Sequence, residues 1–201
     1  MCSIWELTSP GGWHQPVYGY LSLILGYGGY KSLPRAVAPW AVDSGGFSVL
    51  QYHGRWTVSA AEYVARLRRY RDEIGSLVWA APQDWMCEQA IIDGGWHNGQ
   101  YFVGTHLSVA EHQCRTVLNA ARLRELAPDL PIITVVQGQE PDDYVRCADL
   151  YWSLARIDIT TERLVGVGSV CRIQNTAKAG AILHALHARG VTRLHGFGFK
   201  L

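Results

Sequence analysis

The sequence predicts an α/β fold of the (βα)8-barrel type, built as one domain over residues 1–201. Short apolar runs alternate with amphipathic helical patterns, and this alternation is typical of parallel βαβ units. A barrel brings the C-terminal ends of all its strands to one mouth, whereas an open doubly wound sheet does so only near its switch point. Polar residues or glycines stand at or just after the C-terminal ends of different runs, and this position favours the barrel. They are Asp43, Asp84, Gln137, Ser169 and the pair Gly196 and Gly198.

Six apolar runs predict the strands, and four helical patterns lie between the last five of them. The runs cover residues 18–25, 38–42, 77–81, 132–136, 164–167 and 194–197. The helices are predicted over residues 59–74, 108–126, 141–154 and 176–189, with a glycine-rich loop over about 88–105. Pro141 suits the first position of the third helix, and Gly190 suits the residue after the fourth. The first two helices begin with the spacing of a capping box, Ser59 with Glu62 and Ser108 with Glu111.

The strand count falls short of a closed barrel, which needs eight strands. The last run ends close to Leu201, and no helix follows it to cover the open edge. We therefore expect a barrel that is incomplete at its C-terminus. Either a second copy of the chain or another protein would complete it.

Composition and charge exclude several classes of protein. The chain has 18 Lys and Arg against 17 Asp and Glu, so it lacks the excess of a protein that holds nucleic acid by charge alone. The dense stretch Arg66, Arg68, Arg69 and Arg71 is interpreted as the solvated face of a helix. No apolar run reaches the ~18 residues of a membrane span, and the lack of Lys or Arg before Lys31 argues against a secretory signal. The five cysteines form no C-x-x-C pair, which predicts a cytoplasmic protein with free thiols and no metal site.

The stretch Asp-Ser-Gly-Gly-Phe at residues 43–47 is the sharpest chemical signal. Gly45 and Gly46 let a ligand approach the backbone closely, because no Cβ intrudes. Asp43 stands at a strand end, where a carboxylate can act as a base or a nucleophile. The competing interpretation is a turn in which Asp43 caps the following segment.

Three further strand ends carry polar groups. Residues 82–88, Pro-Gln-Asp-Trp-Met-Cys-Glu, place two carboxylates and a thiol on one turn. Taken alone, they are better explained by a helix N-cap at Asp84 and a core position for Cys87. Gln137, followed by Gly138, can donate and accept at once, which suits the edge of a polar heterocycle. Residues 166–169 fit a phosphate-binding loop or a tight turn. His112 and Gln113 are interpreted as structural, and the spacing of the histidines supports no metal site.

In this order, the motifs resemble the tRNA-guanine transglycosylase superfamily, and within it the phage and bacterial 7-deazaguanine DNA transglycosylases (the DpdA-like group). The resemblance implies a (βα)8 barrel that exchanges guanine for a 7-deazaguanine, in the DNA branch a preQ0-type base, through a covalent carboxylate. Guanine-containing DNA and the incoming nucleobase are the implied partners, with no cofactor. The matching stretches span about residues 38–200: 42–47, 80–88, His112-Gln113 with Thr116 and Asn119, 136–138, 164–172 and 195–200.

The resemblance also implies roles for individual residues. The resemblance implies that Asp43 acts as a general acid/base near the sugar and the leaving base. Asp84 is implied to accept from N1–H and the exocyclic amine of guanine, since a carboxylate can accept from two parallel donors. The remaining implied contacts to the base come from Ser44, Gly45, Gly46, Cys87 and Gln137, and from backbone N–H groups near Gly138, Gly168 and Ser169.

Two features depart from the family pattern. The nucleophilic Asp of the family follows the last glycine-rich motif, here residues 195–200, and the zinc ligands of the tRNA enzymes have no counterpart. The expectation is a truncated transglycosylase that keeps the base pocket and lacks turnover. Two alternatives stay open: a base- or DNA-binding subunit completed by another chain, and a barrel enzyme that binds the phosphate of a small metabolite at residues 166–169.

Overall fold

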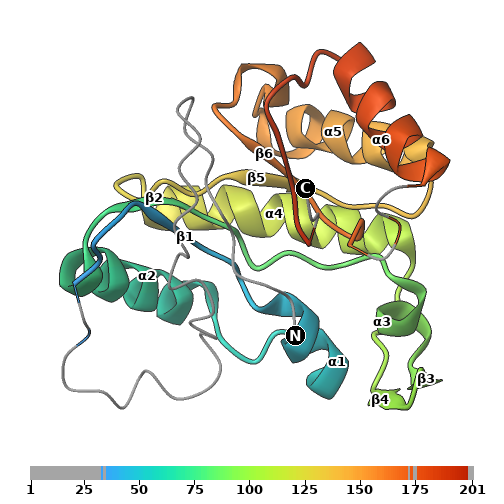
Figure 1. The fold of residues 1–201 in the computed structure, drawn as a ribbon, viewed down its shortest axis with the longest axis horizontal. Coiled ribbons are helices and arrows are strands. Elements are labelled where there is room, and N and C mark those ends of the chain that lie inside the picture. The colour runs from blue at the N-terminus through green and yellow to red at the C-terminus, as the bar shows by residue number, and fades with distance from the viewer. Residues whose placement is uncertain (1–32, 34, 172, 174–175, 199–201) are drawn as a thin grey trace.

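Five short parallel strands form the frame of the fold (Figure 1). The computed structural model describes residues 33, 35–171, 173 and 176–198, so the strand expected within 18–25 lies outside the described residues. β1 pairs with β2, and β5 pairs with β6, which pairs with β7. A bridge from Ala80 to Ile132 joins the two sheets, so the spatial order of the strands follows their order in the chain. The bounds are Trp40–Val42 for β1, Leu77–Ala80 for β2, Thr134–Val136 for β5, Val165–Val167 for β6 and Leu194–Gly196 for β7.

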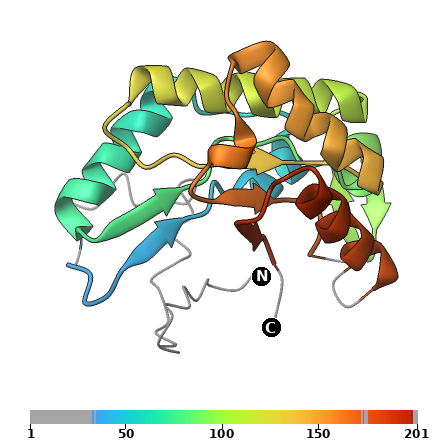
Figure 2. The ribbon, with the colours of Figure 1, turned by 90° about the horizontal axis from the view of Figure 1, so that it is seen from above.

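The described residues form parallel sheets flanked by helices, and they do not close into a barrel. A helix links each strand of this frame to the next: α2 (Ala60–Ile74), α4 (Val109–Leu126), α5 (Pro141–Ala155) and α6 (Ala177–Ala188). Figure 2 shows these four helices in an arc around the strands, from green α2 to red α6. Successive helices contact one another along this arc. The predicted alternation of strands and helices is therefore confirmed.

Local signals position the helix ends. Ser59 and Glu62 form the predicted capping box at the start of α2, and Ser108 accepts a hydrogen bond from the Glu111 N–H at the start of α4. Pro141 occupies the first turn of α5. Gly190 follows the end of α6 with a φ of +92°, a left-handed conformation in which glycine lacks the usual steric penalty.

Both faces of β1, β5 and β6 are buried, whereas β7 is half-buried throughout and β2 is half-buried at its first two residues. Trp40, Val42 and Ala80 pack against residues of α2 and α4 such as Leu67 and Leu123. The alternate residues point to the other face, where they form a separate apolar cluster: Ala41, Trp79, Ala81, Ile133 and Val135, with Phe197 packed against it. Burial on two faces explains why the strands appear in the sequence as continuous apolar runs rather than as alternating patterns.

Two regions hold more regular structure than expected. Helix α1 (Gly46–His53) begins within the Asp-Ser-Gly-Gly-Phe motif. The expected loop at 88–105 contains α3 (Gln89–Asp93) and a hairpin of β3 (Gly95–His97) and β4 (Gln100–Phe102). Asn98 and Gly99 connect the hairpin with φ values of 50° and 76°, the backbone that an Asn-Gly turn adopts. A short 3-10 helix, Ile159–Thr161, precedes β6.

The arginine stretch forms ion pairs on the helix surface, and the described cysteines form no disulfide. Arg68 and Arg71 pair with Asp129, and Arg69 pairs with Glu73, which fits the interpretation of this stretch as a solvated helix face. Cys87, Cys114, Cys147 and Cys171 are free thiols. Among the described residues, no helix has the length and apolar character needed to cross a membrane, and no group of three His, Cys, Asp or Glu could hold a metal ion.

Candidate functional site

A pocket opens at the C-terminal ends of the parallel strands. Six of the predicted site residues line it: Asp43, Gly45, Asp84, Gln137, Gly168 and Ser169. They come from the segments after β1, β2, β5 and β6, so the predicted convergence of strand ends is observed. The other lining residues are Phe47, Met86, Glu88, Cys171, Phe197 and Gly198.

Asp84 is the electrostatic centre of the pocket. Its side chain is buried, with Ser44 Oγ donating to Oδ1 at 2.8 Å and Gln137 Nε2 donating to Oδ2. Burial raises the pKa of Asp84 to about 7, and the neighbouring carboxylate of Asp43 adds to the rise. The hydrogen bonds from Ser44 and Gln137 act in the opposite direction, because they favour the ionised form. Asp84 therefore changes charge near neutral pH.

The Gln137 side chain is held with a defined orientation. Its Nε2 faces Asp84, while its Oε1 accepts a hydrogen bond from Ser169 Oγ at 2.7 Å. Gly168 leaves room for this amide, since a Cβ at that position would lie 2.2 Å from Gln137 Nε2. The amide can thus present its edge to the pocket only because residue 168 is glycine.

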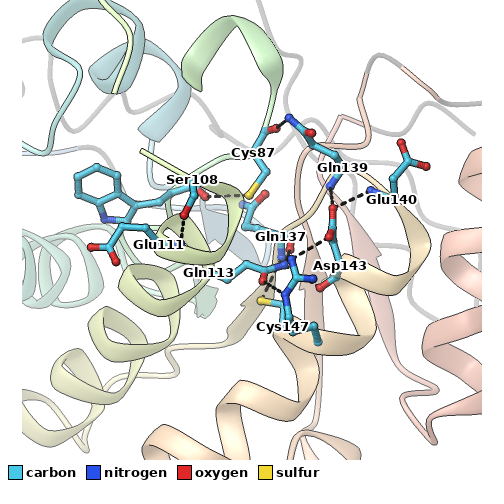
Figure 3. A network of polar contacts seen from close by, with 11 residues as sticks. Cys87, Ser108, Glu111, Gln113, Gln137, Gln139, Glu140, Asp143 and Cys147 are labelled. Atoms are coloured by element: carbon cyan, nitrogen blue, oxygen red, sulfur yellow. Dashed lines mark hydrogen bonds and ion pairs between the residues drawn. The ribbon is translucent and has the colours of Figure 1, made fainter. Parts of the chain in front are cut away.

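A layer of polar contacts beneath the pocket fixes the loop that carries Gln137 (Figure 3). Gln113 Nε2 donates to the carbonyl oxygens of Gln137 and Asp143, each at 2.7 Å. Asp143 Oδ2 accepts from the N–H groups of Gln139 and Glu140, each at 2.9 Å. Gln113 is therefore structural, as predicted, and it acts directly behind the site.

Ser169 links two walls of the pocket. Its φ of 57° places a non-glycine residue in the left-handed region, a strained backbone that often occurs at functional sites. Its hydroxyl accepts from the Cys87 N–H at 2.8 Å and lies 3.0 Å from Glu88 Oε2. One hydroxyl proton can serve only one acceptor at a time, so Gln137 and an ionised Glu88 compete for it.

Asp43 combines the two interpretations drawn from the sequence. Its Oδ1 accepts from the Gly45 N–H at 3.0 Å, a turn-capping contact, and the residue also lines the pocket. Gly45 adopts a φ of 70° directly before α1. Gly46 is tightly packed, because a Cβ there would lie 2.8 Å from the Met86 side chain.

The remaining sequence-predicted residues lie behind the lining. Ser44 and Gly46 support the Asp43 turn, and Gly138 packs against Asp143, where a Cβ would be 2.6 Å from the Asp143 Cβ. The Cys87 thiol is fully buried, and burial raises its pKa well above the usual value, so it remains a neutral core group. The Cys87 N–H donates to Ser169 Oγ, and the burial of the thiol matches the core position considered for it.

One interpretation at the strand ends is wrong, and one expected contact is already used within the fold. Asp84 does not cap a helix, since α3 begins at Gln89 with Glu88 as its N-cap residue. The Gly168 N–H donates to the Val136 carbonyl oxygen at 3.0 Å, so it is not available to a base or to a phosphate. The Tyr144 hydroxyl also donates a hydrogen bond to the Gly168 carbonyl oxygen. His112 is structural, as predicted: it lies buried between Thr105 Oγ1 and the Met86 carbonyl, each 2.6 Å away.

Three lining residues that the sequence did not single out as site residues have recognisable signals. Glu88 is the second carboxylate of the 82–88 turn, Phe47 ends the Asp-Ser-Gly-Gly-Phe motif, and Phe197 ends the last apolar run. Trp56 adds a contact from outside the motifs, because its Nε1 donates to the Asp84 carbonyl at 3.2 Å. The position of Trp56 depends on the path of α1, which the sequence did not predict.

The fold and the pocket define an α/β protein with two carboxylates and an oriented amide at its strand ends. A family model described as DeoxyPurine in DNA protein A (DpdA) matches residues 28–201, and the chain belongs to this family. Membership identifies it in general as a transglycosylase-type protein of DNA modification, with DNA as the substrate. No curated protein matches the sequence.

Proposed function

We propose that this protein exchanges guanine in DNA for a 7-deazaguanine of the preQ0 type at the N-glycosidic bond. The observation that carries the proposal is the buried Asp84 in a pocket that it shares with Asp43 and Gln137. The arrangement of five parallel strands in chain order, with helices along one face, supports a barrel-type architecture for the domain.

Asp84 is proposed to recognise the base. An ionised carboxylate offers about four acceptor positions, and Ser44 and Gln137 use one on each oxygen. The remaining positions can accept from N1–H and the 2-amino group of guanine, which are parallel donors. Adenine lacks a donor at N1 and a 2-amino group, so it would leave the buried carboxylate poorly paired.

Gln137 and Asp43 are proposed to complete recognition and proton transfer. Rotation of the Gln137 amide toward the base would let it meet O6, and Ser169 is positioned to support either orientation. Asp43 would protonate the departing guanine as the C1′–N9 bond breaks and would accept the proton of the incoming base as its bond to C1′ forms. The resemblance places the carboxylate that binds C1′ after the motif at 195–200. The roles proposed for residues 1–201 are base recognition and proton transfer.

Calorimetric titration tests base recognition without requiring the covalent step. We expect the wild-type chain at pH 8 to bind guanine and preQ0, adenine to bind at least tenfold more weakly, and Asp84→Asn to lose binding of all three. Circular dichroism confirms that the variant is folded. A folded wild-type chain that binds neither guanine nor preQ0, or that binds adenine equally well, would contradict the proposed pocket.

An exchange assay tests the reaction itself. Duplex DNA carrying labelled guanine is incubated with preQ0 and the wild-type chain, and release of labelled base is followed over time. The proposed exchange predicts release by the wild-type chain, and a folded chain that binds guanine and releases none would contradict the exchange while leaving base recognition in place. Loss of release in Asp43→Asn with retained calorimetric binding supports its role in proton transfer. Unchanged release in Asp43→Asn would remove Asp43 from the mechanism.

A further inference from the structure

Exposed aromatic side chains gather on one surface beside the pocket. Of the eight large apolar side chains that are exposed in the described residues, four lie on α1 and around β3 and β4. We call them the hairpin face: Tyr52 (65% exposed), Trp96 (76%), Tyr101 (54%) and Val103 (41%). Soluble proteins rarely expose contiguous apolar surface of this kind unless it binds something.

The hairpin face is one continuous surface. Trp96 and Tyr101 are cross-strand partners whose ring centroids lie 5.7 Å apart in an edge-on arrangement. Tyr52 and Tyr101 line a shared hollow with Val103. Backbone contacts hold α1 against β4, since the Val103 N–H donates to the Gln51 carbonyl at 2.9 Å. The aromatic rings therefore stand on backbone segments that hydrogen bonds hold together.

The same elements form the wall of the pocket. Phe47 lines the pocket on α1, and its ring packs edge-on against Phe102 of β4 at 5.8 Å. Phe102 is buried and is the chain neighbour of the exposed Tyr101, so successive residues of β4 face the interior of the protein and the hairpin face. Glu88, which also lines the pocket, directly precedes α3 and the hairpin. The hairpin face therefore lies on the outer side of the same elements, α1 and β4, that carry Phe47 and Phe102 behind the pocket.

The charge pattern of these segments suits a polyanion. Residues 44–61 and 94–110 contain no Asp or Glu, although the whole chain has 17. Arg55 lies in the first of these segments and is exposed. Asp93, the exposed last residue of α3, is the acidic residue nearest to Trp96 in the chain. Aromatic rings whose own segments carry no carboxylate can stack on nucleobases with little repulsion of the phosphates between them.

We infer that the hairpin face stacks on the unpaired or exposed bases of the DNA strand next to the nucleotide that enters the pocket. The inference rests on the proposed function, in which a guanine nucleotide must leave the base stack to reach Asp84. The bases on either side of it then lose a stacking partner. Trp96, Tyr101 and Tyr52 would supply replacement surfaces and hold the displaced strand at the rim of the pocket.

Fluorescence anisotropy with a labelled, guanine-containing 20-mer, single-stranded and duplex, tests the inference. Trp96→Val keeps a residue that suits a strand but cannot stack, and Trp96→Phe keeps an aromatic ring. Tyr52→Ala tests the face from α1, independently of the hairpin. We expect Trp96→Val and Tyr52→Ala each to weaken DNA binding about fivefold or more, and Trp96→Phe to retain most of the affinity.

Two controls separate stacking from other effects. Trp152→Ala removes an aromatic side chain of similar exposure, 56%, from α5, away from the hairpin face, and it should leave DNA affinity unchanged. The dependence of affinity on salt should keep its slope in Trp96→Val, because stacking neutralises no phosphate. Calorimetric binding of free guanine should also be unchanged, which distinguishes failure of this inference from failure of the proposed function.

Three results would overturn the inference. The wild-type chain could fail to bind DNA at low salt, or the folded Trp96→Val and Tyr52→Ala variants could bind DNA as tightly as the wild type. Trp96→Val could instead change only the oligomeric state in sedimentation experiments. The hairpin face would then be an interface between copies of the chain.

Discussion

Asp84, the proposed base-recognition group, is maintained at a cost to the stability of the folded state at pH 8. Its carboxyl is buried beside a second acid, and its pKa rises from 3.8 to about 7, which corresponds to on the order of 4 kcal/mol of differential stability. A pKa that is higher in the folded state stabilises folding below the unfolded pKa. This contribution is lost as the pH rises from about 4 through 7. At pH 8 the folded protein therefore carries the buried carboxylate of Asp84 in its ionised form, and the hydrogen bonds from Ser44 and Gln137 offset only part of the cost of burial.

We predict that Asp84→Asn raises the free energy of unfolding by a few kcal/mol at pH 8 and by much less at pH 5. The amide can be accommodated because Gln137 can rotate so that its Oε1 accepts from Asn and its Nε2 faces Ser169. Urea unfolding of both proteins at the two pH values measures the difference.

Asp129→Asn is the matched control for this prediction. Asp129 is partly exposed, and hydrogen bonds from Arg68 and Arg71 lower its pKa. A lowered pKa stabilises the folded state above the unfolded pKa, so this substitution should lower stability at pH 8. An Asp84→Asn variant that is less stable than the wild type at pH 8 would show that its hydrogen bonds outweigh its burial.

Gly168 makes a second prediction at the residue scale. A Cβ there would lie 2.2–2.5 Å from three atoms of the Gln137 amide, so Gly168→Ala must displace that side chain from Asp84 and Ser169. We expect a loss of about 1–3 kcal/mol in stability, typical of overpacking, together with weaker binding of guanine. Urea unfolding and calorimetry measure the two effects. Unchanged guanine affinity would show that Gln137 is not needed for recognition.

The sequence predicts which residues stand at strand ends, but it does not show the direction in which each side chain points. Asp43, Asp84 and Gln137 were predicted as pocket residues because each follows a strand, and strand ends of a parallel sheet meet at one edge. For Cys87, only the resemblance implied a contact with the base, whereas the residues themselves favoured the core position in which its thiol lies. The backbone there is fixed by distant contacts, from Trp85 N–H to Thr116 and from Cys87 N–H to Ser169, which the sequence does not reveal.

At the scale of elements, helices were predictable where their ends carry local signals. α2, α4, α5 and α6 were all predicted, and no start or end differs by more than one residue. α1 was missed because its start contains Gly45 and Gly46, and glycine is a poor helix former. β3 and β4 were missed because three-residue strands are too short to show alternation, although Asn98-Gly99 is a hairpin signal in the sequence.

The middle of α6 offers a prediction about helix propensity. Gly180 is exposed within the helix, and a Cβ at this position meets no atom within 4 Å. Gly180→Ala should therefore stabilise the protein by about 0.5–1 kcal/mol through propensity alone, with guanine binding unchanged. Thermal unfolding measures the gain. Gly180→Ala also serves as a glycine-to-alanine control for Gly168→Ala. A loss of stability in Gly180→Ala would mean that α6 is not formed as described.

At the scale of the whole molecule, the pocket depends on the junction between the two parallel sheets. Asp43 and Asp84 follow β1 and β2, whereas Gln137 and Ser169 follow β5 and β6. The sheets meet where the Ala80 N–H donates to the Pro131 carbonyl and the Ile133 N–H donates to the Ala80 carbonyl, each at 3.0 Å. α4 packs against both α2 and α5 across this junction. The contact between Asp84 and Gln137 therefore requires both halves to be folded together.

Cooperativity between the halves can be tested by a substitution far from the pocket. Leu67 is fully buried between α2 and the β1–β2 sheet, so Leu67→Ala should cost about 2–5 kcal/mol. If the sheets form one cooperative unit, hydrogen exchange should lose the same protection at Val167 of β6 as at Ala80 of β2, because both amides exchange through the same global opening. Loss of protection confined to residues 40–80 would contradict this, and would show that the strands carrying Gln137 and Ser169 stay folded when those carrying Asp43 and Asp84 do not.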